Sequence, residues 1–126
     1  MKHFSIDKRG RIANVKFDRG SASNALSLEL LRELTDSARS FETDAKTSAV
    51  VITGREDNFT MGFDLKDPEY DSLRASGLVQ QRAGLTFGPR LCRAWEDLPA
   101  LTISAIEGWC VGGGVALTVS GSMTGA

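Results

Sequence analysis

The sequence contains little of what metal sites, disulfide frameworks and histidine-based catalysis require. Its 126 residues include two cysteines and one histidine. Cys92 and Cys110 match neither a disulfide framework nor the paired spacing of a zinc site, so we expect no bound metal and a reducing, cytoplasmic setting. His3 lies near the N-terminus, which disfavours a Ser-His or Cys-His catalytic pair within this chain.

An excess of charge of one sign and a long apolar run are also missing. Fifteen basic side chains oppose sixteen acidic ones, a balance that predicts neither nucleic acid nor a membrane surface as a partner. No apolar run approaches the ~18 residues of a membrane helix, and the N-terminus lacks the apolar core of a secretory signal. The length suits one domain with a sizeable core. We therefore expect a soluble intracellular domain, or part of one.

The first third of the chain contains one strand pattern and one helix pattern. Apolar and polar residues alternate over 4–17 on both sides of a turn at Arg9 and Gly10, which predicts a β-hairpin. Ser27 is expected to cap a helix that continues to Phe41, because apolar residues recur there at helical spacing. A small-residue loop, RGSAS, separates the two elements.

The remaining elements are predicted in the order strand, helix, strand, helix. The run AVVITG, residues 49–54, is typical of a short strand buried on both faces, and a second buried strand is expected from Leu101 to Ile106. Strands that alternate with helices after a hairpin predict an α/β layered sheet with right-handed crossovers. The two helices are expected over 71–96, with interruptions near Gly77, Gly84 and Pro89, and over VALTVS, residues 115–120.

Each of the two buried strands runs into a glycine-bearing turn, at the edge where ligands bind in open α/β sheets. The first turn carries NFTMGFDL and the second carries WCVGGGVAL. Two backbone amides that converge from such turns would hold an oxyanion as it develops on a carbonyl, and small residues would let the ligand lie against the main chain. On their own, the three glycines fit a plain tight turn better. Neither GxxxxGK[ST] nor GxGxxG occurs, which disfavours a nucleotide-binding loop.

Three motifs together indicate a family. SNALSLELLREL, VVITGREDNFTMGFDLKD and LPALTISAIEGWCVGGGVAL occur in the order and spacing of the enoyl-CoA hydratase/isomerase, or crotonase, family. The chain resembles the N-terminal portion of that family over about residues 4–120. The resemblance implies a ClpP/crotonase-like α/β fold, a spiral of ββα units, of which this chain would form the N-terminal part.

The resemblance also implies which residues bind and polarise the substrate, an acyl-CoA thioester. In the family, two backbone amides form an oxyanion hole that stabilises the thioester enolate, and the matching residues here are Phe63 and Gly113. Lys66 matches a position that contacts the CoA phosphates, and Arg19 is a further candidate for that role. Beyond the CoA thioester no cofactor and no metal are implied. The loop that cradles the CoA moiety corresponds to Ala22, Asn24, Ala25 and Leu26.

Simpler interpretations stay open for several of these residues. Lys66 is equally well a solvated loop charge, and Asn24 is equally well a residue that stabilises a turn. Phe63 is alternatively a core aromatic residue, which would leave its backbone donor unaffected. Asp64, in GFDL, is expected to brace the following turn rather than to donate a proton.

The chain departs from the family at the first catalytic position. Hydratases of the family use two glutamates to add water, and the first lies three residues beyond the middle glycine. Ala116 occupies that position here and can neither accept nor donate a proton. Glu107 is the acidic residue nearest the glycines in sequence, but it precedes them and does not match the motif.

A second departure is length, because members of the family are much longer. We expect residues 1–120 to form an incomplete core and residues 121–126 a short tail outside the family, as in a truncated or spliced product. The parent would be a homotrimer or a dimer of trimers. Whether this chain is an enzyme stays open between two hypotheses. One is an acyl-CoA-binding protein whose parent is an enoyl-CoA hydratase/isomerase; the other is a catalytically inactive acyl-CoA-binding or oligomer-modulating remnant.

Overall fold

A parallel sheet with one antiparallel edge forms the centre of the molecule. The computed structural model describes residues 3–125 of the chain. The strand order is β1-β2-β3-β5-β7, in which β1 pairs antiparallel with β2 and the other neighbours pair parallel. The predicted hairpin is confirmed. The strands are β1 (Phe4–Arg9), β2 (Ile12–Phe17), β3 (Ala49–Thr53), β5 (Leu101–Ala105) and β7 (Met123–Gly125).

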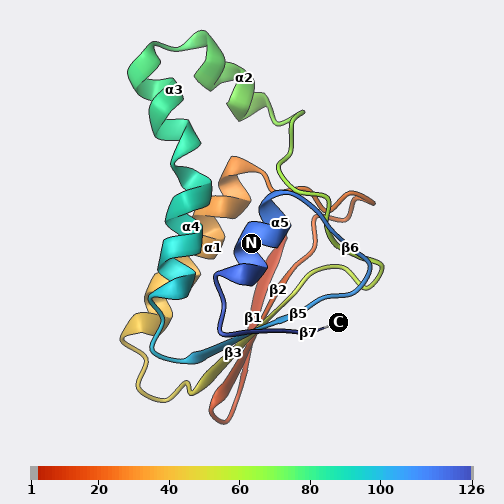
Figure 1. Cartoon of the computed structure of the whole chain (residues 1–126), viewed down its shortest axis with the longest axis vertical. Helices are drawn as coiled ribbons and strands as arrows, with labels where there is room; N and C mark the ends of the chain where they lie inside the picture. Colours follow the sequence, from red (N-terminus) through yellow and green to blue (C-terminus); the bar gives the residue numbers. More distant parts are fainter. Residues whose placement is uncertain (1–2, 126) are drawn as a thin grey trace.

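Helices α1 (Leu28–Glu42) and α4 (Phe87–Glu96) lie side by side against one face of the sheet (Figure 1). Register places Val15, Ile52 and Ser104 in one buried row on that face. The opposite face of β3 is half exposed, so the expectation that this strand is buried on both faces was wrong, because α1 and α4 pack on the same side. Hydrophobic burial of one strand face therefore provides the core.

The predicted capped helix is confirmed as α1. The Ser27 hydroxyl accepts a hydrogen bond from the Leu30 amide at 3.1 Å, which satisfies one of the free donors of the first turn. The apolar stripe buries five large side chains in the core. These are Leu28, Leu30, Leu31, Leu34 and Phe41.

The predicted helix over 71–96 is three helices. These are α2 (Pro68–Ala75), α3 (Leu78–Leu85) and α4, and in Figure 1 α2 and α3 extend away from the sheet. The expected interruptions near Gly77 and Gly84 are confirmed, since α2 ends at Ala75 and α3 ends at Leu85, whereas the one near Pro89 was wrong. Pro89 is the third residue of α4, where a backbone amide has no acceptor within the helix, so proline is tolerated.

The second sheet was not expected from the sequence. Strands β4 (Asn58–Thr60) and β6 (Trp109–Cys110) pair parallel just beyond the ends of β3 and β5. Helix α5 (Gly113–Val119) follows β6 and confirms the helix predicted over 115–120, with its start two residues earlier and its end one residue earlier. Strands of two or three residues leave no alternating pattern, so periodicity could not detect them. They nevertheless hold together the two turns that were singled out above.

β7 pairs parallel with β5 and lies within the stretch expected to be a tail. That this stretch lies outside the family stays a prediction, and its last residue, Ala126, lies outside the described residues. In residues 3–125 no helix combines the length and the apolar character needed to cross a membrane.

Asn24 joins three parts of this fold from a fully buried position. Its side-chain amide donates to the carbonyls of Phe17 at 3.2 Å and Phe59 at 2.8 Å, and its side-chain oxygen accepts from the Arg19 amide at 2.9 Å. Its φ of 43° lies in the left-handed region, which asparagine tolerates better than most residues. The Asn24 side chain therefore connects the end of β2 to β4 through the main chain.

We predict that Asn24→Ala lowers the free energy of unfolding by about 3 kcal/mol, since three hydrogen bonds in a buried site are lost. Asn24→Gly loses the same bonds but adopts the left-handed conformation freely, so it should be about 1 kcal/mol more stable than the alanine variant. Urea unfolding of both variants measures the difference. Stability equal to that of the unmodified chain would show that water replaces these bonds without cost.

Candidate functional site

The loop before α1 and the loop before α2 run side by side. The Leu26 amide donates to the Gly62 carbonyl at 2.7 Å, and the Asp64 amide donates to the Leu26 carbonyl at 2.9 Å. Successive amides of an extended chain point to opposite sides. The Phe63 amide therefore points away from Leu26.

The second loop is the glycine turn, residues 111–114. The Gly114 amide donates to the Val111 carbonyl at 3.0 Å, and Gly112 has φ 57° and ψ −117°. These are the values of the first central residue of a type II′ turn, which favours glycine. α5 begins at the next residue, Gly113.

The loop before α2 and the glycine turn lie so close together that little room is left for a side chain at Gly62 or Gly113. A Cβ added to Gly62 would lie 3.0 Å from the Val111 carbonyl oxygen and 3.6 Å from the Gly113 nitrogen. A Cβ added to Gly113 would lie 3.1 Å from Cζ of Phe63. The structure thus brings Phe63 and Gly113 together, as expected for neighbouring strand ends. That their amides hold a carbonyl stays a prediction.

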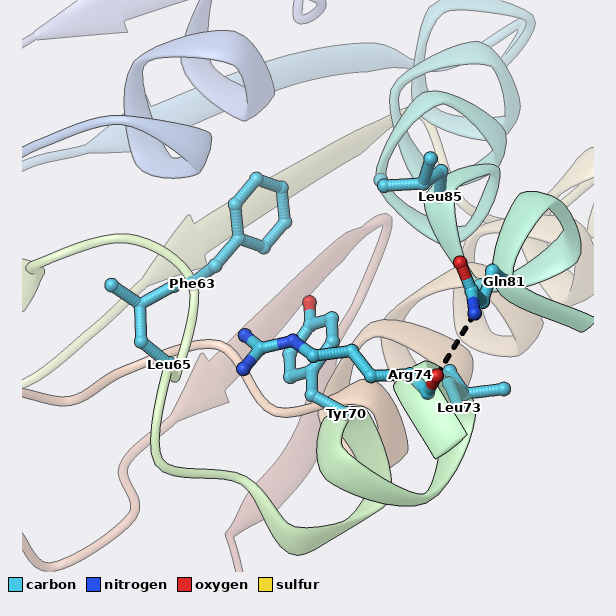
Figure 2. Close-up of a pocket in the computed structure, with 9 residues that line it drawn as sticks. Phe63, Leu65, Tyr70, Leu73, Arg74, Gln81 and Leu85 are labelled. Atoms are coloured by element: carbon cyan, nitrogen blue, oxygen red, sulfur yellow. Dashed lines mark hydrogen bonds between the residues drawn. The ribbon is translucent and has the colours of Figure 1, made fainter. Parts of the chain in front are cut away.

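Two pockets open beside these loops. The first, which we call the helical pocket, has a volume of about 360 Å³. In Figure 2, Phe63 and Leu65 on the loop face side chains of α2 and α3 across this pocket, where Gln81 donates to the Arg74 carbonyl at 2.9 Å. Its lining residues are Phe63, Leu65, Tyr70, Leu73, Arg74, Gln81, Gly84, Leu85 and Gly88.

The second pocket, which we call the glycine pocket, has a volume of about 330 Å³ and lies directly against the glycine turn. Ala116 lines it, so the position of the missing glutamate does face a cavity. Its lining residues are Leu26, Leu31, Phe63, Gly88, Pro89, Leu91, Cys92, Gly112, Gly113, Ala116 and Leu117.

An ion pair supports the Phe63 loop. The Arg19 guanidinium donates to the Asp64 carboxylate at 2.6 Å and to the Ala25 carbonyl at 3.1 Å, and both charged side chains are only about a quarter or less exposed. This bond, together with the Lys66 amide, lowers the pKa of Asp64. The bond from the Lys66 amide, 3.1 Å long, confirms that Asp64 braces the following turn. Arg19 therefore holds the loop together in this structure.

The residues expected to cradle CoA differ in their exposure. Asn24, Ala25 and Leu26 are buried, so their contribution to any ligand would come from the main chain or from positioning. Ala22 is exposed and its carbonyl accepts from the Asn58 side chain. Lys66 is exposed at the start of the segment leading to α2. Contact of these residues with CoA stays a prediction.

Groups able to transfer protons are scarce around the glycine turn. Cys92 is the one titratable side chain among the residues that line the glycine pocket. Glu107 is exposed and lines a separate pocket with Lys16 and Arg55. In the helical pocket, burial raises the pKa of Tyr70, which keeps its phenol protonated. Within the described residues no group of three His, Cys, Asp or Glu side chains lies close enough to hold a metal ion.

Sequence reasoning missed Cys92 and Pro89, both from α4, as lining residues of the glycine pocket. Their orientation depends on how α4 packs on α1, which motif spacing does not report. The partner of Asp64 was missed as well, because Arg19 lies 45 residues away in the chain. The one sequence signal for this partner was the position of Arg19, a basic residue at the start of the small-residue loop.

We predict that Asp64→Asn weakens the dependence of unfolding on pH. Because the folded-state pKa of Asp64 is lowered below 3.8, its stabilisation is present above the unfolded-state pKa and is lost as the pH falls through the folded-state pKa. The variant should therefore be less stable by about 2 kcal/mol near neutral pH and should lose less stability on acidification.

Urea unfolding between about pH 3 and pH 7 measures this difference. Asp71→Asn is the matched control, because Asp71 is 69% exposed and its ion pair with Arg74 spans one helical turn at the surface. Equal pH profiles for Asp64→Asn and the unmodified chain would contradict the assignment.

Comparisons with known proteins agree with this geometry. The chain matches the family model described as enoyl-CoA hydratase/isomerase over residues 7–123. It is 29% identical to a probable mitochondrial enoyl-CoA hydratase of Dictyostelium discoideum, covering 91% of this chain and 39% of that protein. It is also 29% identical to 4-chlorobenzoyl coenzyme A dehalogenase-2 of an Arthrobacter species, covering 94% of this chain and 42% of that protein.

A solved structure extends the likeness to the fold. The enoyl-CoA hydratase of Bacillus anthracis superimposes with a TM-score of 0.84 at 28% identity, covering 97% of this chain and 46% of that chain. This confirms the crotonase-like α/β fold predicted from the sequence. The chain spans about two fifths of the length of the relatives named above. With a match over nearly its whole length, the chain belongs to the enoyl-CoA hydratase/isomerase family.

Proposed function

We propose that this chain binds an acyl-CoA thioester and polarises its carbonyl between the backbone amides of Phe63 and Gly113. The observation that carries the proposal is the close contact of the two loops, in which a Cβ on Gly62 would reach the Gly113 nitrogen at 3.6 Å. Fixed main-chain donors aimed at one point stabilise negative charge on a carbonyl oxygen because they need no reorganisation during the reaction. The resulting enolate-like charge is what acyl-CoA chemistry of this kind requires.

The rest of the substrate would lie along the two neighbouring loops. Lys66 is exposed and cationic, which suits contact with the CoA phosphates. Ala22 and the main chain of Asn24, Ala25 and Leu26 would form the surface against which the pantetheine arm lies. Arg19 would not contact the CoA phosphates, because its guanidinium is paired with Asp64.

Ala116 favours a second version of the proposal, binding without turnover. The residue lines the glycine pocket where hydratases of the family have a glutamate, so water there has no carboxylate base at that position. Relatives of this chain include a short-chain-enoyl-CoA hydratase, a dienoyl-CoA isomerase and a dehalogenase, so the family uses one framework for several acyl-CoA reactions. Assembly of the longer parent as a homotrimer or dimer of trimers is also part of the proposal.

We predict that crotonyl-CoA labelled with ¹³C at the thioester carbonyl shows a downfield shift in its NMR signal when bound, because hydrogen bonds polarise the carbonyl. Gly113→Pro should abolish much of the shift. Proline lacks the backbone N–H and is tolerated at the first position of a helix, which Gly113 occupies in α5.

Gly113→Ala is the matched control, because it adds a Cβ near the Phe63 ring but retains the N–H. It should keep the shift even if binding weakens. Loss of the shift in both variants would assign the effect to crowding and contradict the role of the Gly113 amide. No shift in the unmodified chain with crotonyl-CoA bound would refute the proposed function.

Catalysis is tested separately by hydration of crotonyl-CoA. The reaction is followed by the loss of absorbance of the double bond that is conjugated to the thioester. We expect binding without measurable turnover, since Ala116 supplies no proton-transferring group. Ala116→Glu restores a carboxylate at this position and is the variant in which turnover would be sought. Turnover by the unmodified chain would rule out the version without catalysis.

A further inference from the structure

The side chain of Phe63 separates the two pockets. Among the residues that line the helical pocket and the glycine pocket, Phe63 and Gly88 are common to both. The backbone amide of Phe63 belongs to the proposed carbonyl site, but its ring is a separate feature with its own surroundings. Because this side chain lines both pockets, its size affects whether the two pockets are connected.

The tip of the Phe63 ring fits between two helix beginnings. A Cβ added to Gly88, near the start of α4, would lie 3.0 Å from Cζ of Phe63, and one added to Gly113, at the start of α5, would lie 3.1 Å from the same atom. Glycine at both positions therefore leaves just enough room for the ring. The ring tip thus lies next to the starts of α4 and α5, and Gly88 is also the other residue that lines both pockets.

The lining on both sides of the ring is mainly apolar. The glycine pocket is bounded mainly by aliphatic carbon. The helical pocket is bounded by side chains such as Leu73 and Leu85, with Arg74 and Gln81 as polar exceptions. Each pocket alone is near the lower end of the range of ligand sites, about 300–1,000 Å³. Each would hold a short acyl chain, whereas a long one needs both.

We propose that the Phe63 side chain determines the length of acyl chain that this site accepts, by closing the passage between the glycine pocket and the helical pocket. This inference rests on the proposed binding of an acyl-CoA thioester. The ring is 42% exposed and projects from a loop, so it is held at its tip and not by a surrounding core. Removing the ring joins two apolar pockets without removing the backbone amide.

Isothermal titration with butanoyl-, octanoyl- and dodecanoyl-CoA tests the inference. In the unmodified chain, affinity should stop increasing with acyl length once one pocket is filled. Phe63→Ala should raise the affinity for dodecanoyl-CoA relative to butanoyl-CoA by roughly tenfold, the effect expected when about two further methylene groups become buried. Phe63→Leu, which removes less volume and preserves more packing, should shift the ratio in the same direction by a smaller factor.

Gly88→Ala tests the opposite direction, because it adds a methyl group 3.0 Å from Cζ of the ring and so reduces the free space between the pockets. It should lower the ratio of dodecanoyl-CoA to butanoyl-CoA affinity. Met61→Ala is the matched control, since Met61 lies on the same loop, is 43% exposed and lines neither pocket. Its ratio should equal that of the unmodified chain.

The outcomes distinguish this inference from the proposed function. If acyl-CoA binds with the carbonyl shift but Phe63→Ala and Phe63→Leu leave the ratio unchanged, the inference is wrong and the proposed function stands. If the unmodified chain binds no acyl-CoA of any length, the proposed function is wrong and the inference fails with it. An equal change in Met61→Ala would assign the effect to the loop as a whole and overturn the role of the ring.

Discussion

Contact between two stretches of main chain governs the arrangement of this molecule around its site. The loop before α1 pairs with the loop before α2 through Leu26, and the glycine turn packs against the loop before α2 at Gly62. The Val111 carbonyl leaves little room for a Cβ at Gly62, and the positive φ of both Gly62 and Gly112 favours glycine at these two positions. The pairing of β4 with β6 and the buried amide of Asn24 maintain this contact.

The sequence allowed the larger elements and the closeness of the two glycine-bearing turns to be predicted. Period-two alternation identified the hairpin, helical spacing and Ser27 identified α1, and the three joint motifs identified the fold. The two turns that adjoin in the structure were recognised because each follows a buried strand. Each of these signals lies in a short stretch of sequence or in the order of the motifs, so one sequence is enough to detect it.

Other features could not be predicted because they depend on tertiary packing. β4 and β6 are too short to show a period, and the partner of Asp64 is distant in sequence. The orientation of α4, which brings Cys92 and Pro89 to the glycine pocket, is determined by its packing against α1. Tertiary contacts also explain the error at Pro89, since its tolerance depends on which residue begins the helix.

The low burial of α2 and α3 affects how readily this part of the molecule opens. α2 has no buried residue and α3 has only Gly84, so these helices contribute little to the hydrophobic core. α2 is instead tethered to α1 by the two hydrogen bonds between Arg32 and Glu69, 2.6 and 2.7 Å long. Segments with few buried contacts open at a small fraction of the free energy of global unfolding. The outer wall of the helical pocket is therefore expected to open at a lower cost in free energy than the sheet and α1, which carry the hydrophobic core.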